Sequence, residues 1–343
     1  MDNDEIEQSE EQYDQIKLEV DKGQQPLRID KFITNRVEKI SRNRIQQAAK
    51  INCLLVNNEP VKVNYKIKPG DEIVMMVPKP LAEFTMVPEQ MDLNIVFEDD
   101  DVMVVNKPAG MVVHPGTGNW SGTLAHGLVH HFGDVEKLGL NPQRPGIVHR
   151  IDKWTSGLLV VAKNEHALTH LSRQFFNKTT DRVYYALVWG EFEEPEGTVT
   201  GNIARSVRDR KVFQVYEDET IGKHAITHYK TLENFCYVSL VQCQLETGRT
   251  HQIRVHMKYK GHPLFADHEY GGDRIVKGTV FSKYRQFVDN CFKICNRQAL
   301  HARTLAFDHP VSGERLSFTS ELPEDMSKLI EKWRNYAKQL VEK

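Results

Sequence analysis

The spacing of hydrophobic residues divides the chain into two regions, and each region predicts a different set of helices and strands. In the first region, apolar side chains recur at helical spacing from Leu27 to Ile40, and a second short helix is predicted around Ile45. A strand hairpin at 54–63 and a further strand at 73–77 follow, separated by turns rich in Asn, Pro and Gly. Two helices followed by a small strand ribbon predict a compact α+β unit.

From Leu93 onward, short apolar runs between turns predict many strands. The clearest runs lie at residues 94–97, 102–105, 158–161, 184–189 and 235–245. Helical patterns interrupt them at 165–176, where Asn164 is a candidate cap, and at 323–340. Because these strands do not alternate regularly with helices, the pattern predicts an α+β fold with a mixed, mostly antiparallel sheet rather than a doubly wound parallel one.

The segments between and before these regions are polar or rich in proline. Residues 1–25 lack apolar periodicity and are predicted to form a flexible acidic tail, and the prolines within 80–92 predict a linker. This organisation predicts a small N-terminal domain at 26–79 and a large domain at 93–343.

The distribution of charge says more than the net charge of −2. Residues 1–25 carry nine acidic side chains against two lysines, and the remainder carries 43 basic and 38 acidic residues. Residues 26–80 alone hold eleven Lys or Arg against five Asp or Glu. A local basic surface is typical of nucleic-acid binding, although a Lys-rich solvated surface explains the same counts.

The five cysteines are scattered along the chain, which argues against a disulfide framework and for a reducing compartment. None of them has partners at zinc-ligand spacing, so no metal site is expected. No apolar run is long enough to span a bilayer, and the acidic N-terminus does not resemble a secretory signal. We therefore expect a cytoplasmic protein.

Three polar segments carry candidate chemistry. Residues 106–116 form an irregular Pro and Gly turn after a strand. In 149–163, Asp152 precedes an apolar strand and is flanked by Arg150 and Lys153, and cations of this kind hold a carboxylate ionised as a nucleophile requires. A surface salt-bridge cluster is the alternative explanation.

The third segment, 245–257, has strand-like alternation. This period predicts that Thr250, Gln252 and Arg254 share one face, where their donors would suit a phosphate or a base edge. An exposed polar strand without a ligand is the alternative.

Together these segments resemble the sequence blocks of the RluA-type pseudouridine synthases. Residues 149–157 resemble the block H-R-L-D-x-x-T-S-G with Ile151 in place of Leu, and 245–256 resemble L-x-T-G-R-T-H-Q-I-R-V-H at every position. Two further blocks, K-P-x-G-x-x-V-H-P-G and Y-x-A-L-V-x-G, resemble residues 107–116 and 184–190. Trp154 departs from the family, where an acidic or small polar residue is commoner.

The N-terminal region adds a second resemblance. Residues 26–79 resemble the alpha-L RNA-binding domain first known from a small-subunit ribosomal protein, which is typical of the large-ribosomal-subunit (RluD-like) branch of the family. The combined resemblance implies an isomerase that converts uridines of large-subunit (23S) rRNA, or of its precursor particle, and needs no metal or other cofactor. A tRNA substrate is the alternative with the same chemistry.

The family resemblance also assigns roles to residues. It implies Asp152 as the nucleophile, attacking either the ribose C1′ or the uracil C6, with Arg254 paired to it and Tyr184 packed against a flipped uracil. Arg150 would enter the base stack that the target uridine vacates. Further RNA contacts are expected in both domains, at His149, Thr155, Arg249, Arg28, Lys31, Arg42 and Arg44.

Two rival functions remain open at this point. The histidines at 126, 130 and 131, or His251 and His256, would suit a metal-dependent nuclease, but no acidic residue nearby in sequence completes a ligand set. A non-catalytic ribosome-assembly factor is the second rival, and the retention of Asp152, Tyr184 and Arg254 argues against it.

Overall fold

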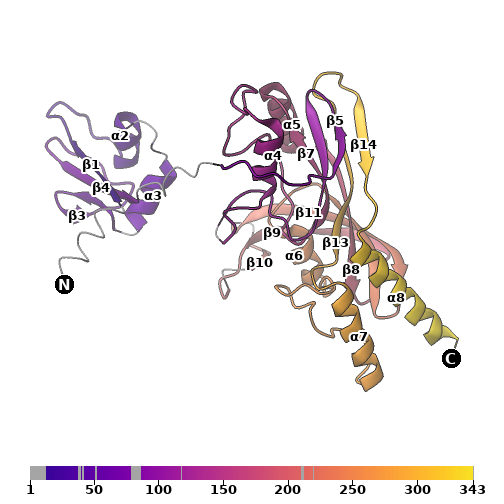
Figure 1. Ribbon diagram of the computed structural model, residues 1–343. Helices are drawn as coiled ribbons and strands as arrows, with labels where there is room; N and C mark the ends of the chain where they lie inside the picture. Colours follow the sequence, from indigo (N-terminus) through magenta and orange to yellow (C-terminus); the bar gives the residue numbers. More distant parts are fainter. Residues whose placement is uncertain are drawn as a thin grey trace, which may run out of the picture. The chain divides into compact units, whose positions relative to one another are not determined.

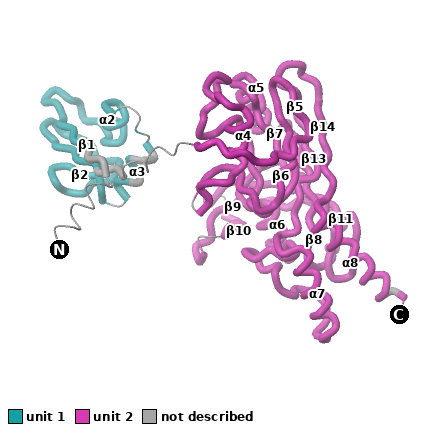
Figure 2. The backbone as a smooth tube through the Cα atoms, in the orientation of Figure 1, with its two compact units in different colours: residues 1–85 teal, residues 86–343 magenta. Residues whose placement is uncertain are grey.

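The computed structural model describes residues 13–37, 40, 42–50, 52–78, 86–116, 118–209, 212–218 and 220–342. The chain divides into two compact units, Met1–Thr85 and Met86–Lys343, which are described separately here (Figure 2). Each unit has its own hydrophobic core, so each is expected to hold its fold by its own packing. No helix among the described residues combines the length and the apolar composition needed to cross a membrane.

The first unit packs two helices against a four-stranded antiparallel sheet in the order β1-β4-β2-β3. Its elements are β1 (Tyr13–Glu19), α2 (Ile29–Arg36), α3 (Arg42–Lys50), β2 (Leu54–Val56), β3 (Glu59–Pro60) and β4 (Glu72–Pro78). Phe32 and Ile33 of α2 bury their side chains against Leu54 and Met75 of the sheet. The two helices and the strand ribbon predicted from the sequence are confirmed.

The flexible tail predicted for residues 1–25 is wrong where the structure describes it. Strand β1 pairs antiparallel with β4 along its whole length. Ile16, Leu18 and Val20 contribute to the core of this unit, with Val20 only 1% exposed. Because these apolar residues alternate, they form a strand despite the acidic residues around them. Residues 1–12 of the predicted tail lie outside the described residues.

The predicted linker at 80–92 also needs correction. Residues 79–85 lie outside the described residues, but 86–92 belong to the second unit. Met86 is buried, and the Glu89 carboxylate accepts a hydrogen bond from the Gly122 N–H at 2.9 Å. Packing and hydrogen bonding therefore fix this segment in spite of its Pro-containing composition.

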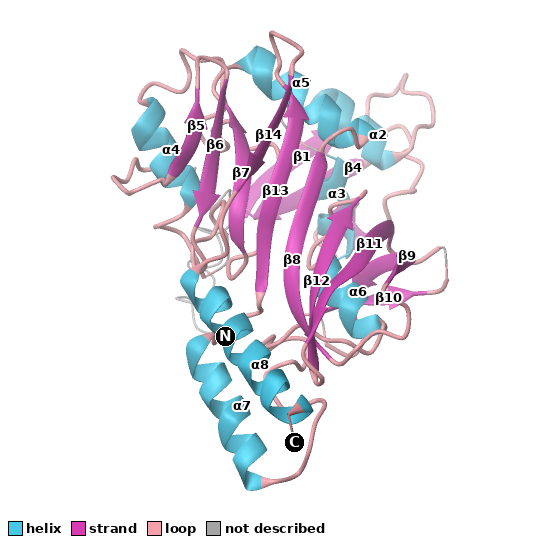
Figure 3. Cartoon of the chain, turned by 90° about the vertical axis from the view of Figure 1, so that its right-hand side faces the viewer, coloured by secondary structure: helices cyan, strands magenta, loops and turns pink. Residues whose placement is uncertain are grey.

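The second unit is built on a ten-stranded sheet with the order β10-β9-β11-β12-β8-β13-β7-β6-β5, and β14 pairs with β13 beside this path (Figure 3). The strands are β5 (Ile95–Glu98), β6 (Val102–Lys107), β7 (Ser156–Ala162), β8 (Asp181–Trp189), β9 (Glu196–Arg205), β10 (Phe213–Tyr216), β11 (Lys223–Asn234), β12 (Val238–Leu245), β13 (Leu300–Asp308) and β14 (Arg315–Thr319). Strands β13 and β7 pair in parallel, and the other pairs are antiparallel. The mixed, mostly antiparallel sheet predicted from the sequence is confirmed.

Helices cover this sheet in separate groups (Figure 1). They are α4 (Leu124–Phe132), α5 (Glu165–Asn177), α6 (Gln252–Tyr259), α7 (Ser282–Ile294) and α8 (Glu324–Val341). Trp333 of α8 packs against Trp189 of β8, with their ring centroids 6.1 Å apart. Leu171 of α5 packs over β7, while Val255 of α6 packs over β9 and β11. The groups leave the middle of the sheet, at β12, β8 and β13, to form the floor of a pocket.

Candidate active site

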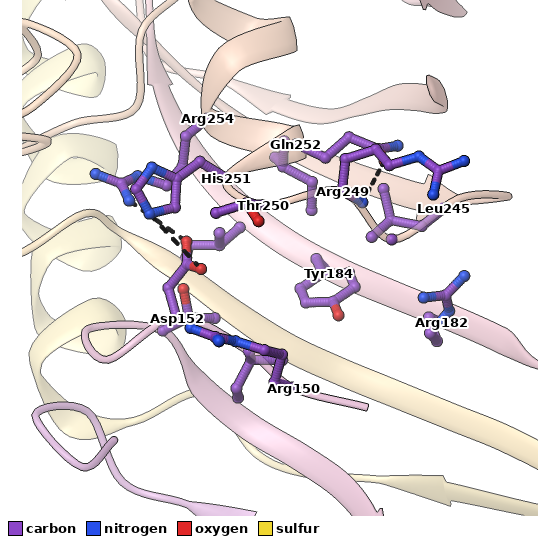
Figure 4. A pocket seen from close by; sticks show the side chains of 15 residues that line it. Arg150, Asp152, Arg182, Tyr184, Leu245, Arg249, Thr250, His251, Gln252 and Arg254 are labelled. Carbon is purple, nitrogen blue, oxygen red and sulfur yellow. Dashed lines mark hydrogen bonds and ion pairs between the residues drawn. The ribbon is translucent and has the colours of Figure 1, made fainter. Parts of the chain in front are cut away.

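A pocket lies over the central strands of the large sheet (Figure 4). The loop before β7 contributes Arg150 and Asp152, strand β8 contributes Arg182 and Tyr184, and the segment that leads into α6 contributes its other wall. Asp152 is the one acidic residue among the residues that line it. The three sequence blocks singled out above around residues 152, 184 and 250 therefore converge on one place.

A buried lysine forms hydrogen bonds to the backbone of the loop that carries Asp152. Lys107, at the end of β6, is 1% exposed, and its ammonium donates to the carbonyls of Pro108, Met111 and Lys153 at 2.7, 2.8 and 3.1 Å. The Gly110 N–H donates to the same Lys153 carbonyl at 2.8 Å. These bonds tie the turn after β6 to the loop that carries the carboxylate.

A buried arginine holds the next peptide of that loop. Arg297 donates from Nη1 to the Trp154 carbonyl at 2.9 Å, and its Nε and Nη2 bind the Asp325 carboxylate at 2.7 and 2.9 Å. Arg297 is not predicted from the sequence, because nothing in its local sequence indicates a contact with the carbonyl of Trp154, which lies far from it along the chain.

Burial lowers the pKa of Lys107 to about 7, and the positive charge of Arg297 adds to this shift while Asp152 opposes it.

Residues Gln252–Tyr259 form the helix α6, so the strand predicted for 245–257 is wrong beyond the end of β12 at Leu245. His251, which adopts the left-handed region (φ 56°, ψ 21°), is the N-cap of this helix. The apolar residues Ile253, Val255 and Met257 alternate as in a strand, but α6 is buried on all sides over these positions. Because six consecutive residues of this short helix are buried, the spacing of its apolar residues no longer distinguishes a helix from a strand, which explains the wrong prediction.

The residues that the helix brings together are not those that a strand would have placed on one face. Gln252 turns inward, where its Oε1 accepts hydrogen bonds from the Thr247 hydroxyl and the Arg249 N–H. His251 and Arg254, one turn apart, both approach the Asp152 carboxylate, with His251 Nε2 at 3.9 Å from Oδ1 and Arg254 Nη1 at 3.4 Å from Oδ2. Thr250, Gln252 and Arg254 therefore do not share a face as predicted.

Arg254 belongs to a buried ionic network. Its Nε and Nη2 bind the two oxygens of Asp267 at 2.7 and 2.8 Å, and Nη2 also lies 2.5 Å from Glu269 Oε2. Its guanidinium carbon lies 4.7 Å from the centre of the Tyr270 ring. Burial lowers the pKa of Arg254, but the hydrogen bonds and charges of Asp267, Asp152 and Glu269 outweigh it and raise the pKa above its ordinary value. Arg254 is therefore a fixed cation beside Asp152.

Tyr184 lies in the pocket on β8 and is 7% exposed. Burial raises the pKa of its hydroxyl, and the charge of Asp152 acts in the same direction, while Arg182 opposes both. The phenol is consequently protonated at neutral pH. It offers a flat apolar surface and one proton close to the pocket.

The residues predicted to contact RNA in the large domain take different positions. Arg150 is exposed at the pocket, and Thr155 lines the pocket although it is 1% exposed. Arg249 also lines it and donates from Nε to the His224 carbonyl at 2.9 Å. The structure thus brings these three side chains together with Asp152.

His149 forms contacts within the second unit. Its Nε2 accepts a hydrogen bond from the Val160 N–H at 3.1 Å, and its ring stacks on Phe175 at a centroid distance of 4.5 Å. Burial lowers the pKa of His149 to about 3, with Arg182 contributing. The ring is therefore neutral, and the position of His149 gives no support to a direct RNA contact.

The basic residues predicted to bind RNA in the small domain lie on or beside its helices. Lys31 and Arg42 are exposed, and Arg28 pairs with Asp30 at 2.8 Å. Arg44 lies in α3, but its side chain is outside the described residues.

The structure gives no support to a metal site at the histidines considered above. His126 is buried on α4, where its Nδ1 lies 2.7 Å from the Thr123 hydroxyl in a capping box. In the part of the chain that the structure describes, the one group with ligand spacing is Asp99, Asp101 and His309. Asp99 already accepts hydrogen bonds from the Asp101 N–H and from His309 within the fold, so these contacts account for the group without an ion.

Family models match both units of the chain. The model described as RNA pseudouridylate synthase matches residues 101–259, and the S4 domain model matches residues 27–73. The second match confirms the RNA-binding domain predicted for the N-terminal region.

Curated relatives match nearly the whole chain. A protein of Chlorobaculum parvum named uncharacterized RNA pseudouridine synthase is 48% identical over 93% of this chain and 98% of its own length. A protein of Neisseria meningitidis named ribosomal large subunit pseudouridine synthase D is 41% identical over 88% of this chain and 78% of its own length. Among solved structures, human RNA pseudouridylate synthase domain containing 1 is similar with a TM-score of 0.50 and 25% identity, over 71% of this chain and 95% of that protein.

Proposed function

This chain belongs to the RNA pseudouridylate synthase family and is an isomerase that acts on RNA, and from that premise we propose that it converts specific uridines of large-subunit (23S) ribosomal RNA. The relatives named for the large ribosomal subunit support this substrate, as does the basic S4 domain.

Asp152 is the proposed nucleophile, and one observation carries this assignment: it is the single carboxylate among the residues that line the pocket. The reaction breaks the bond between ribose and uracil N1, turns the base and joins the ribose to C5. An ionised carboxylate can form the covalent intermediate that splits this exchange into two easier steps. The guanidinium of Arg254, with Nη1 at 3.4 Å from Oδ2, orients the Asp152 carboxylate.

Tyr184 and His251 are the proposed partners of Asp152. The Tyr184 ring provides a surface for the flipped uracil, and its protonated hydroxyl can donate a hydrogen bond to it. His251 lies 3.9 Å from Asp152, and its Nδ1 is 2.9 Å from the Tyr270 hydroxyl. Burial lowers the pKa of His251, so the neutral ring adds no second cation beside the nucleophile.

Arg150 is the proposed replacement for the flipped base. It is exposed at the pocket, two residues from Asp152 in the chain. A base inside a helical stem cannot reach the Asp152 carboxylate in the pocket without leaving its stack, which costs roughly a few kcal/mol. A planar guanidinium that stacks in the gap recovers part of this cost.

The test is a map of pseudouridines in rRNA and tRNA from cells with and without this protein. Loss of pseudouridine at large-subunit rRNA positions is the expected result, and purified protein should restore it on bare rRNA. Loss confined to tRNA would reject the rRNA substrate and keep the chemistry. Unchanged maps together with no conversion in vitro would reject the enzyme function in favour of RNA binding alone.

A further inference from the structure

Arg182 is a buried arginine that lines the pocket and forms no ion pair with a carboxylate of the described residues. Arg182 lies on β8, two residues before Tyr184, and is 8% exposed. Its Nε–H has no hydrogen-bond acceptor among the described residues, and the charges that act on it include no carboxylate of that set. Buried guanidinium groups normally pair with an acid or a carbonyl, because an unpaired buried donor or charge is costly.

The surroundings of Arg182 are shaped for a cation that faces the pocket. Its guanidinium carbon lies 5.5 Å from the centre of the Phe175 ring, which supports the side chain from one side. A Cβ at Gly248 would lie 2.8 Å from Nη1, so the missing side chain of Gly248 makes room for the guanidinium beside the segment that leads into α6. Burial lowers the pKa of Arg182, as expected for a cation without a counter-charge.

The charges around the pocket are unbalanced. Four arginines line it, at positions 150, 182, 249 and 254, against the single carboxylate of Asp152. Arg254 is neutralised by Asp267 and Glu269. The remaining arginines leave a surplus of positive charge, which fits an anionic ligand.

We propose that Arg182 binds a phosphate group of the RNA backbone next to the target uridine. The inference rests on the proposed function, and it adds an anchoring group that none of the family blocks discussed above assigns. In Figure 4 Tyr184 lies between Asp152 and Arg182, so both side chains face the pocket around the tyrosine ring. The planar fork of donors matches a phosphate in a bidentate manner, and a buried contact of this kind is strong.

The experiment compares two small probes that differ only in phosphate, uridine 3′,5′-bisphosphate and uridine. Binding of each to the full-length protein is measured by NMR titration, for wild type, Arg182→Gln, Arg182→Lys and the control Arg285→Gln. Arg285 is exposed on α7 and does not line the pocket. Thermal melting of each variant shows that it is folded.

Wild type is expected to bind the bisphosphate at least about tenfold more tightly than uridine, as a charged hydrogen bond predicts. Arg182→Gln should remove most of that preference, Arg182→Lys should keep part of it, and Arg285→Gln should keep all of it. In wild type, the Nε–H resonance of Arg182 should shift with the bisphosphate and stay in place with uridine. This last measurement decides the matter even if the variants do not fold.

Three results would overturn the proposal. They are a wild-type protein without a preference for the bisphosphate, an Arg182→Gln protein that keeps it, and an Arg182→Gln protein that loses both probes equally. The last result would assign Arg182 to the uracil rather than to a phosphate. None of these measurements needs turnover, so conversion of uridine in bare rRNA by wild type tests the proposed function separately.

Discussion

Arg254 approaches the Asp152 carboxylate with one nitrogen, Nη1 to Oδ2 at 3.4 Å. Arg254 binds two other carboxylates more closely: Glu269, which is partly exposed, at 2.5 Å, and Asp267, whose side chain is fully buried, at 2.7 and 2.8 Å. Asp267 therefore fixes the arginine, and the arginine in turn orients the carboxylate. Three groups in series decide where the proposed nucleophile points.

Asp267→Asn should damage both stability and turnover. Removing one charge of a buried pair costs about 3 kcal/mol in the free energy of unfolding. Because Arg254 is then free to shift, kcat on rRNA should fall at least about tenfold. Glu269→Gln is the matched control, since the Glu269 side chain is 46% exposed and its loss should cost much less. Equal effects of the two substitutions on kcat and on unfolding would contradict the serial arrangement.

Asp152→Asn should abolish turnover, with a loss of at least about 10³-fold, as expected when a nucleophile is removed. No other carboxylate lines the described pocket to replace it. Folding and RNA affinity should stay nearly unchanged, because the substitution is almost isosteric. Activity within about tenfold of wild type would exclude Asp152 as the nucleophile.

Removing residues 1–85 should weaken rRNA binding more than it slows the chemical step. The deleted unit carries the basic S4 domain, and the pocket lies wholly in the second unit. Lys and Arg contacts to phosphate release counterions, so the dependence of affinity on salt should flatten as well. In the full-length chain, Lys31→Ala and Arg42→Ala should each reproduce part of this effect. A salt dependence that stays the same after truncation would mean that the S4 domain does not touch RNA.

Arg150→Lys should slow conversion of a structured stem-loop and spare a short unstacked RNA with the same uridine. The lysine keeps the charge and loses the planar stacking surface. An unstacked RNA has less stacking to replace when its base flips. Single-turnover rates of both proteins on both RNAs measure the difference. Equal losses on the two RNAs, or no loss on either, would assign Arg150 to the phosphates alone.

The free energy of unfolding should fall as the pH drops from about 6.5 to about 4. Burial lowers the pKa of His256 and of His301 to about 4, so below pH 6.5 the unfolded chain takes up protons that the folded chain does not. Each histidine should contribute a slope of about 1.4 kcal/mol per pH unit. Above pH 6.5 both are neutral in either state, and this contribution to stability is complete.

His301→Asn tests this assignment by denaturant unfolding at several pH values. His301 lies between the hydroxyls of Ser156 and Ser320, at 2.9 and 2.8 Å, and the amide can keep one of these contacts. The variant should be less stable at pH 7 but lose less stability than wild type on acidification. A slope that matches wild type would show that His301 is not among the groups that titrate.

The sequence alone determined the class of the fold and the family of the enzyme. Elements with strong local signals were predicted correctly, as for α5, where Asn164 accepts the capping hydrogen bond from Ala167. The blocks around Asp152, Tyr184 and Arg254 could be identified because they are contiguous in sequence. Local patterns of this kind need no knowledge of distant neighbours.

Only the tertiary structure decided which groups act on one another. Strand β1 pairs with β4, which lies far from it in sequence, and residues 252–257 of α6 form a buried helix although their apolar residues alternate as in a strand. The Asp152 loop is held by Lys107 and Arg297, which lie far from it in sequence. Burial and through-space charge decide the strength of these contacts, and both depend on how the whole chain packs, which no local pattern encodes.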